Sequence, residues 1–193
     1  MAAKSAASQS SAAKGPAPQS TRWVAFLRGI NVGGINIKMT DLAAVFRDLG
    51  FEDVKTVLAS GNVLFRASEP NLKLKGAIEQ ALRTRFGYDA WVILVTVEEL
   101  RRVVDAFPFP GYDETKQPYV MFLADPKVLA DLLAIEDQLD PAVDRLAPGE
   151  GVLYWEVTKG ETVHSAFSKH SAKPRFKALT TTRNMRTVRK LLG

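Results

Sequence analysis

The sequence has no cysteine among its 193 residues, which excludes disulfide bonds, thiol nucleophiles and thiolate metal sites. It has only two histidines, His164 and His170, and the sequence places no partner beside them for metal binding or for triad chemistry. No stretch approaches the roughly 20 apolar residues that a membrane-spanning helix needs. We therefore expect no metal site and no membrane partner. The absence of cysteine is compatible with the cytoplasm, where we expect the protein to reside.

Acidic and large aliphatic residues are absent from residues 1–21, which consist mainly of Ala, Ser, Gln, Pro and Lys. Such a segment buries too little apolar surface to offset its ordering entropy, so we expect a disordered tail. An organellar transit peptide has a similar composition. The remaining chain is long enough for one large domain or two small ones.

Apolar periodicity predicts alternating strands and helices after the tail. The first six elements have the order strand, helix, strand, strand, helix, strand, which is the ferredoxin-like unit. Thr40 and Gly50 are expected to cap and to end the first helix. The expected elements are strands at 23–28, 54–59, 62–66 and 90–97 and helices at 40–49 and 71–86. We predict an α+β fold with a ferredoxin-like βαββαβ unit at 22–97 and a second, smaller α+β lobe at 98–193.

The pattern after residue 98 is less regular than in the first unit. It predicts strands near 119–123 and 152–158 and helices near 100–107 and 127–136. Residues 165–180 are weakly patterned around Pro174, and a last helix is expected at about 183–192. In this helix Met185 belongs to the apolar stripe, so we expect it in the core.

Residues 28–39 read RGINVGGINIKM, which is nearly a mirror image around Gly33 and Gly34. Two glycines between alternating arms are typical of a tight β-hairpin, in which Asn31 would face Asn36. In a ferredoxin-like sheet the first and third strands are antiparallel neighbours. The end of the first strand should therefore lie beside the Ser60-Gly61-Asn62 turn.

Positive charge is concentrated at the C-terminus. From residue 159 to the end there is one acid, Glu161, against nine lysines and arginines. Such segregation favours an anionic partner, although a solvated basic helix and loop is the alternative interpretation. The last helix presents a basic row that could contact nucleic-acid phosphates without reading sequence: Arg183, Arg186, Arg189 and Lys190.

Three motifs resemble a bacterial family described as domain of unknown function 1697. They are RGINVGG at 28–34, SGN at 60–62 and TTRNMRT at 181–187. The resemblance covers nearly the whole chain from residue 22. It implies a ferredoxin-like α+β architecture and assigns no activity, substrate or cofactor. The family pattern suggests Trp and Asn where this chain has Met185 and Arg186.

These motifs predict a composite polar site for an anionic, phosphate-bearing small molecule or nucleotide, because Arg and Asn offer donors suited to carboxylate and phosphate. The alternative at the same residues is a structural network that holds turns and satisfies carbonyls. The candidate ligand-binding residues are Arg28, Asn31, Gly33, Gly34, Lys38, Ser60, Asn62, Arg183 and Asn184.

Two other function classes stay open at this stage. One is non-sequence-specific nucleic-acid binding through the basic C-terminal segment, and the other is a structural or protein-interaction role. Base stacking on Trp23, Phe26 and Phe65 is possible in such a sheet, but core packing is the preferred interpretation. Enzymatic activity is left open, since no paired acid and base emerges; Glu156 is the acid on a strand that could point into a cleft. No cofactor is identified.

Overall fold

The computed structural model describes residues 20–30, 36–109 and 113–193. Its first unit has the predicted βαββαβ order, with a four-stranded antiparallel sheet in the order β2-β3-β1-β4. Phe26 lies opposite Asn62 in the register of β1 and β3, so the end of β1 does lie beside the 60–62 turn. The elements are β1 (Thr21–Arg28), α1 (Met39–Asp48), β2 (Glu52–Thr56), β3 (Asn62–Ala67), α2 (Asn71–Phe86) and β4 (Trp91–Thr96).

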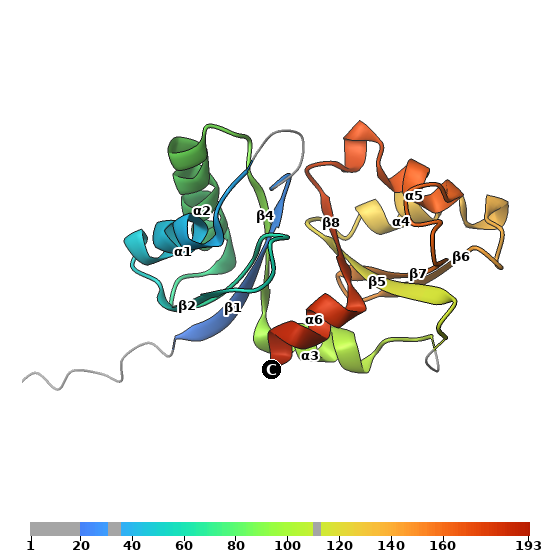
Figure 1. Cartoon of the computed structure of the whole chain (residues 1–193), viewed down its shortest axis with the longest axis horizontal. Coiled ribbons are helices and arrows are strands. Elements are labelled where there is room, and N and C mark those ends of the chain that lie inside the picture. The colour runs from blue at the N-terminus through green and yellow to red at the C-terminus, as the bar shows by residue number, and fades with distance from the viewer. Residues whose placement is uncertain (1–19, 31–35, 110–112) are drawn as a thin grey trace, which may run out of the picture.

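Successive side chains of β1 point to opposite faces of the sheet, and both faces are apolar and buried. Trp23, Ala25 and Leu27 face α1 and α2, which cover one side of the sheet (Figure 1). Val24 and Phe26 face the other way, toward the second unit. The aromatic side chains of β1 and β3 are buried on one face or the other, so they are core residues and offer no surface on which bases could stack.

The second unit repeats the topology of the first. Its sheet has the order β6-β7-β5-β8, which is again a βαββαβ arrangement, and the sequence WVAFL of β1 has its counterpart in YVMFL of β5. The α+β prediction is therefore confirmed. The elements are β5 (Lys116–Leu123), α4 (Val128–Leu133), a 3-10 helix (Glu136–Gln138), β6 (Asp144–Gly149), β7 (Val152–Thr158), α5 (Ala166–Ser171), a second 3-10 helix (Pro174–Phe176) and β8 (Thr180–Asn184).

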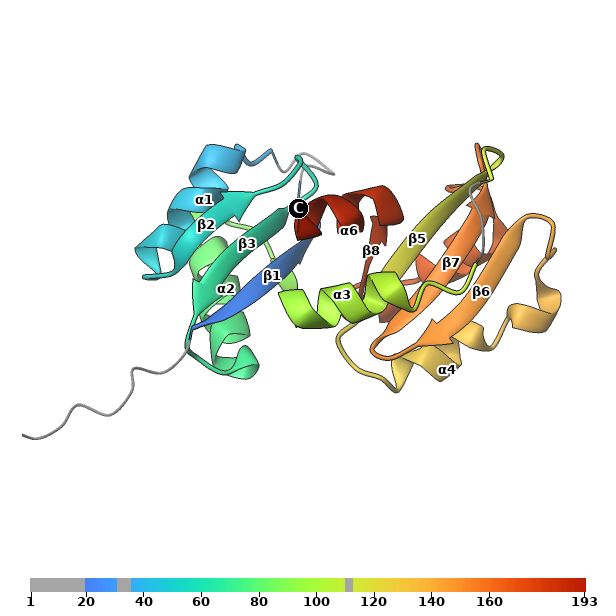
Figure 2. The ribbon, with the colours of Figure 1, turned by 90° about the horizontal axis from the view of Figure 1, so that it is seen from below.

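Two helices lie between the sheets, each following the last strand of a unit (Figure 2). They are α3 (Val97–Asp105) and α6 (Met185–Leu192), and they pack against each other. Thr96 and Glu99 form a capping box at the start of α3, and Asn184 caps α6. Phe26 and Phe122 stack across the units with ring centroids 4.3 Å apart. A shared apolar core therefore joins the two sheets.

Several element boundaries differ from the sequence-based expectation. Lys38 precedes α1 and makes no side-chain cap, so the prediction that Thr40 caps this helix is wrong. Strands β6 and β8 were not expected. Both are edge strands, β6 contains Pro148, and β8 is a polar threonine run, so neither shows the apolar pattern of a central strand. As a result Arg183 lies in a strand and not in the last helix.

The hairpin expected around Gly33 and Gly34 lies outside the described residues, as does most of the 1–21 tail. Met185 is fully buried, as its place on the apolar stripe indicated. Within the described ranges, no helix is long and apolar enough to cross a membrane. The domain boundary at 97/98 stays a prediction.

Candidate functional site

Arg183 links the two units at the centre of the molecule. It pairs with Val120 in the register of β8 and β5, and this places its side chain on the sheet face that looks toward the first unit. There the side chain is only 8% exposed, and its guanidinium lies 5.3 Å from the Phe26 ring centroid. Burial, and then the neighbouring charge of Arg28, lower the pKa of Arg183 to about 10, so it stays charged at neutral pH.

Every N–H group of the Arg183 guanidinium has an acceptor within the protein. Five contacts span both units: Nε donates to Asn62 Oδ1 (2.6 Å), Nη1 to Thr181 Oγ1 (2.8 Å) and the Thr182 carbonyl (2.9 Å), and Nη2 to the carbonyls of Leu27 (2.6 Å) and Ser60 (3.1 Å). A guanidinium has five N–H donors, so none remains for another partner. Arg183 therefore holds the end of β1 and the 60–62 turn against β8.

Asn62 organises the turn that Arg183 contacts. Its side-chain nitrogen donates to the Val57 carbonyl at 2.7 Å and to Ser60 Oγ at 2.9 Å, while its oxygen accepts from Arg183. Gly61 has a φ of 72°, and an added Cβ would come within 2.5 Å of Ile30 Cγ2. The SGN motif is thus a packed turn, in which glycine is required both by conformation and by space.

Arg28 makes the second link between the units. Its Nη1 donates to the Thr180 carbonyl at 2.5 Å and to Thr180 Oγ1 at 3.2 Å. Burial lowers the pKa of Arg28. Beside it, Lys177 Nζ lies 5.2 Å from the ring centroid of Trp91, which pairs with Arg28 across β1 and β4. In the described part of the chain, no carboxylate forms an ion pair with Arg28, Lys177 or Arg183.

The predicted composite site is thus brought together in part. Arg28, Ser60, Asn62 and Arg183 meet at the junction of β1, β3 and β8. Lys38 is exposed at the start of α1, and Asn184, next to Arg183, uses its side chain to cap α6. Asn31, Gly33 and Gly34, which are also predicted to bind the ligand, lie outside the described residues. Ligand binding at this junction stays a prediction, and so does the alternative that these residues form a structural network.

A cleft of about 790 Å³ lies on the second unit, where the sheet extends past α3 and α6. Its floor is the same face of β5 and β7 that carries the shared core, because Pro118 and Glu156 pair two positions beyond Val120 and Tyr154. Phe107 and Phe109 form one wall, and the first turns of α6 form another. The lining includes six charged groups: Asp113, Lys116, Lys159, Arg186, Arg189 and Glu156.

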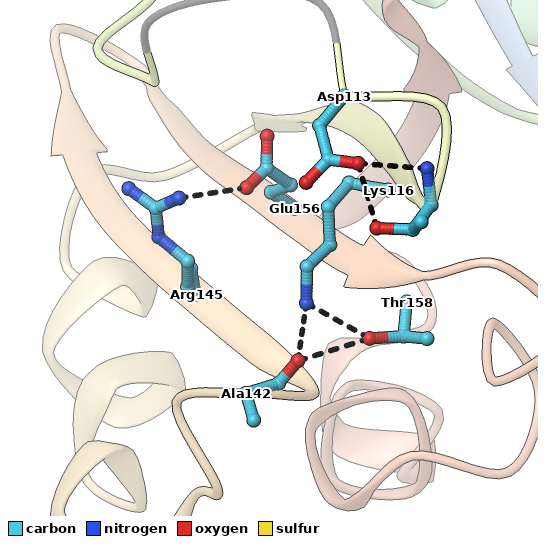
Figure 3. A network of polar contacts seen from close by, with 7 residues as sticks. Asp113, Lys116, Ala142, Arg145, Glu156 and Thr158 are labelled. Carbon is cyan, nitrogen blue, oxygen red and sulfur yellow. Dashed lines mark hydrogen bonds and ion pairs between the residues drawn. The ribbon is translucent and has the colours of Figure 1, made fainter.

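Charged contacts brace the floor and the rim of this cleft (Figure 3). Glu156 Oε2 accepts from Arg145 Nη1 at 3.0 Å, and Lys116 Nζ donates to Thr158 Oγ1 at 2.9 Å and to the Ala142 carbonyl. Glu156 is 7% exposed. Glu156, the acid that could point into a cleft, therefore lines this one, and it is paired with Arg145 of the neighbouring strand β6.

The other acid of the cleft, Asp113, is held by local hydrogen bonds. Its Oδ1 accepts from the backbone N–H of Thr115 at 2.8 Å and from the Thr115 hydroxyl at 2.6 Å. These bonds, and to a lesser degree the charges of Lys116 and Lys159, lower the pKa of Asp113 below its usual value. The carboxylate is therefore ionised at neutral pH.

Three cations of the cleft make no side-chain hydrogen bond or ion pair to any residue that the structure describes: Lys159, Arg186 and Arg189. All three are exposed. Arg186 and Arg189 lie one turn apart on α6, whose N-terminal end carries the positive pole of the helix dipole. Because Glu156 is paired with Arg145, the cleft keeps a positive excess, and this arrangement suits an anion.

Sequence reasoning missed most of these residues. Lys116, Arg145 and Lys159 belong to three different strand ends, and only the sheet register brings them together. The signal that could have found them is period-two alternation: Phe122, Val120, Pro118 and Lys116 share one face, which turns from apolar to charged along β5. In the described ranges, no group of three or more acidic or histidine side chains could hold a metal ion.

Comparison with known proteins agrees with this fold. A family model described as "Protein of unknown function (DUF1697)" matches residues 20–154. The chain is also similar to the solved structure of the conserved bacterial protein SP0830 from Streptococcus pneumoniae, with a TM-score of 0.73 and 23% identity over 90% of this chain and 97% of that one. This similarity concerns the fold alone. Among curated proteins nothing matches.

Proposed function

The chain belongs to the DUF1697 family, whose description assigns no activity, and we propose that it binds a phosphate-bearing small molecule in the cleft beside α6. The observation that carries this proposal is the convergence of Lys159, Arg186 and Arg189 on one cavity of about 790 Å³, with no side-chain hydrogen bond or ion pair to them in the described ranges. Clefts of roughly 300–1,000 Å³ are typical for small ligands.

The arginines provide the recognition of phosphate. A guanidinium offers paired donors that match two phosphate oxygens, and Lys159 adds a point charge from the position just after β7. The start of α6 adds a favourable dipole, because anions are stabilised near helix N-termini. Asn184 Oδ1 already accepts from the Arg186 N–H at 2.9 Å, so this residue caps the helix and fixes the position of its first turn.

Calorimetric titration of the full chain with inorganic pyrophosphate and ribose 5-phosphate tests the proposal. We expect saturable binding, and we expect the double variant Arg186→Ala/Arg189→Ala to weaken it at least tenfold. The matched control is Arg47→Ala/Arg85→Ala, which removes two exposed arginines from the first unit. Equal weakening in both variants would indicate a general charge effect, and unchanged binding in the α6 variant would refute the proposal.

Non-specific nucleic-acid binding is the second candidate, because Arg186, Arg189 and Lys190 are exposed in a row on α6. Arg183 is buried and does not belong to that row. Three phosphate contacts on a single strand predict a slope of about −2 for log K against log salt, since each contact contributes roughly −0.7. A salt series with a single-stranded oligonucleotide measures that slope. If pyrophosphate does not displace the oligonucleotide, the oligonucleotide binds outside the cleft.

A further inference from the structure

The half of the cleft away from α6 has a different chemistry from the phosphate-binding half. Here the lining is aromatic on one side and carries the Glu156 carboxylate on the floor, and this carboxylate accepts a hydrogen bond from Arg145 next to the lining. On the basis of the proposed function, we infer that the ligand is a nucleotide whose base is read by Glu156 and Arg145 and lies against Phe107.

Glu156 has an acceptor that the protein leaves open. Its Oε2 is bonded to Arg145, whereas Oε1 has no hydrogen-bond partner among the described residues and points away from Arg145 (Figure 3). The fully enclosed polar side-chain atoms without a partner in the described ranges are Trp23 Nε1 and Tyr88 Oη, so Glu156 Oε1 is reachable from the cleft. A largely buried carboxylate oxygen favours an N–H donor from a ligand.

Arg145 is held in place from two directions. Its Nη1 donates to Glu156, and its guanidinium carbon lies 4.7 Å from the ring centroid of Phe109. The side chain is 45% exposed, so other N–H groups of the fork face solvent or a ligand. Glu156 and Arg145 together present an acceptor beside a donor, in a geometry that the sheet and the aromatic ring fix in advance.

The aromatic wall supplies a surface for a planar ring. Phe107 and Phe109 pack edge to face with centroids 5.5 Å apart, and Phe107 packs in the same way on Tyr154 at 5.7 Å. Phe109 is buried by these contacts, while Phe107 is half-buried and lines the cleft. Base–aromatic stacking stabilises binding by about 1–3 kcal/mol per base, and every base offers a face for it.

This pattern fits a nucleotide base that presents a donor beside an acceptor. Guanine presents an N–H donor at N1 beside the O6 acceptor, and adenine presents its N6 amino group beside the N1 acceptor. In both cases the donor meets Glu156, the acceptor meets Arg145, and the phosphate reaches Lys159, Arg186 and Arg189. The cavity of about 790 Å³ is large enough for the whole molecule.

Calorimetry on the full chain with GMP, AMP, UMP, guanosine and ribose 5-phosphate tests this inference. We expect GMP or AMP to bind at least tenfold more tightly than ribose 5-phosphate. Glu156→Gln should remove most of that advantage without weakening ribose 5-phosphate binding. Glu161→Gln is the matched control, because it removes an exposed acid of the same unit outside the cleft lining. Phe107→Leu, which keeps apolar volume and removes the ring, should give the same selective loss if Glu156→Gln unfolds.

The outcomes separate the two proposals. If ribose 5-phosphate binds and the nucleotides bind no better, the nucleotide inference is wrong and phosphate binding stands. If guanosine binds as tightly as GMP, base recognition stands and the phosphate proposal is wrong. If Glu156→Gln leaves the advantage of GMP and AMP over ribose 5-phosphate unchanged, the donor–acceptor pairing with Glu156 and Arg145 is wrong.

Discussion

Replacing Arg183 by Ala tests whether the junction of the two units depends on one guanidinium. The variant leaves Asn62 Oδ1, the Leu27 carbonyl and Thr181 Oγ1 without their donor in a buried place. At about 1–1.5 kcal/mol for each of the three unsatisfied acceptors, the loss is about 3–4.5 kcal/mol. Removing a desolvated charge recovers part of this, so we expect the free energy of unfolding to fall by about 2–3 kcal/mol.

Urea denaturation followed by circular dichroism measures that loss, and a melting curve should show a drop of roughly 4–12 °C for a chain of this size. Arg186→Ala is the matched control, since this arginine is exposed on the adjacent helix and should change stability by less than about 0.5 kcal/mol. The loss of unfolding free energy in Arg183→Lys should lie between the losses in Arg183→Ala and Arg186→Ala, because an ammonium group cannot reproduce the planar, multiple donors of a guanidinium. If Arg183→Ala unfolds at the wild-type midpoint, the network interpretation is refuted.

Three further changes probe the core and the turn. Gly61→Ala should cost about 2 kcal/mol or more in a urea titration, against about 1 kcal/mol for Gly50→Ala, because both have positive φ but only Gly61 lacks room for a Cβ. Equal losses would refute the steric argument. Tyr88→Phe should leave the free energy of unfolding at pH 7 unchanged or raise it, because the Tyr88 hydroxyl is buried with no hydrogen-bond partner in the described ranges. Tyr154→Phe should lower it by about 1 kcal/mol, because the Tyr154 hydroxyl donates to a backbone carbonyl. Burial raises the pKa of Tyr88 to about 12, from 10 when exposed, so the unfolded chain releases this proton first. The free energy of unfolding of the wild type should therefore fall as pH rises from 10 to 12, and that of Tyr88→Phe should fall less steeply. The same change in unfolding free energy between pH 9 and pH 11 in both proteins would contradict this. Phe122→Ala should lower the free energy of unfolding by about 3–5 kcal/mol in the same urea titration, because it removes the ring that stacks on Phe26 and leaves a cavity between the sheets. A loss below about 1 kcal/mol would show that the units do not depend on their shared core.

The sequence alone predicted the order of the elements in the first unit. Its strands alternate clearly and its helices carry regular apolar stripes, so 71–86 was predicted to the residue, and the ferredoxin-like order placed the end of β1 beside the SGN turn. Local patterns specify such elements because each buries one face on a single sheet. The same reasoning missed β6 and β8, which are edge strands with proline or threonine in place of an apolar face.

Only the tertiary structure decided which charged residues meet. Arg28 and Arg183 are far apart in the chain, and the register of β8 against β5 turned Arg183 inward while Asn184 became a helix cap. The cleft arises in the same way, from strand ends and a helix start whose neighbours are set by sheet pairing. Periodicity records which face of an element is buried, but it carries no information about what lies across that face. The junction therefore emerged only when the two units were packed together, and the cleft only when the strands of the second sheet were paired and α3 and α6 packed beside them.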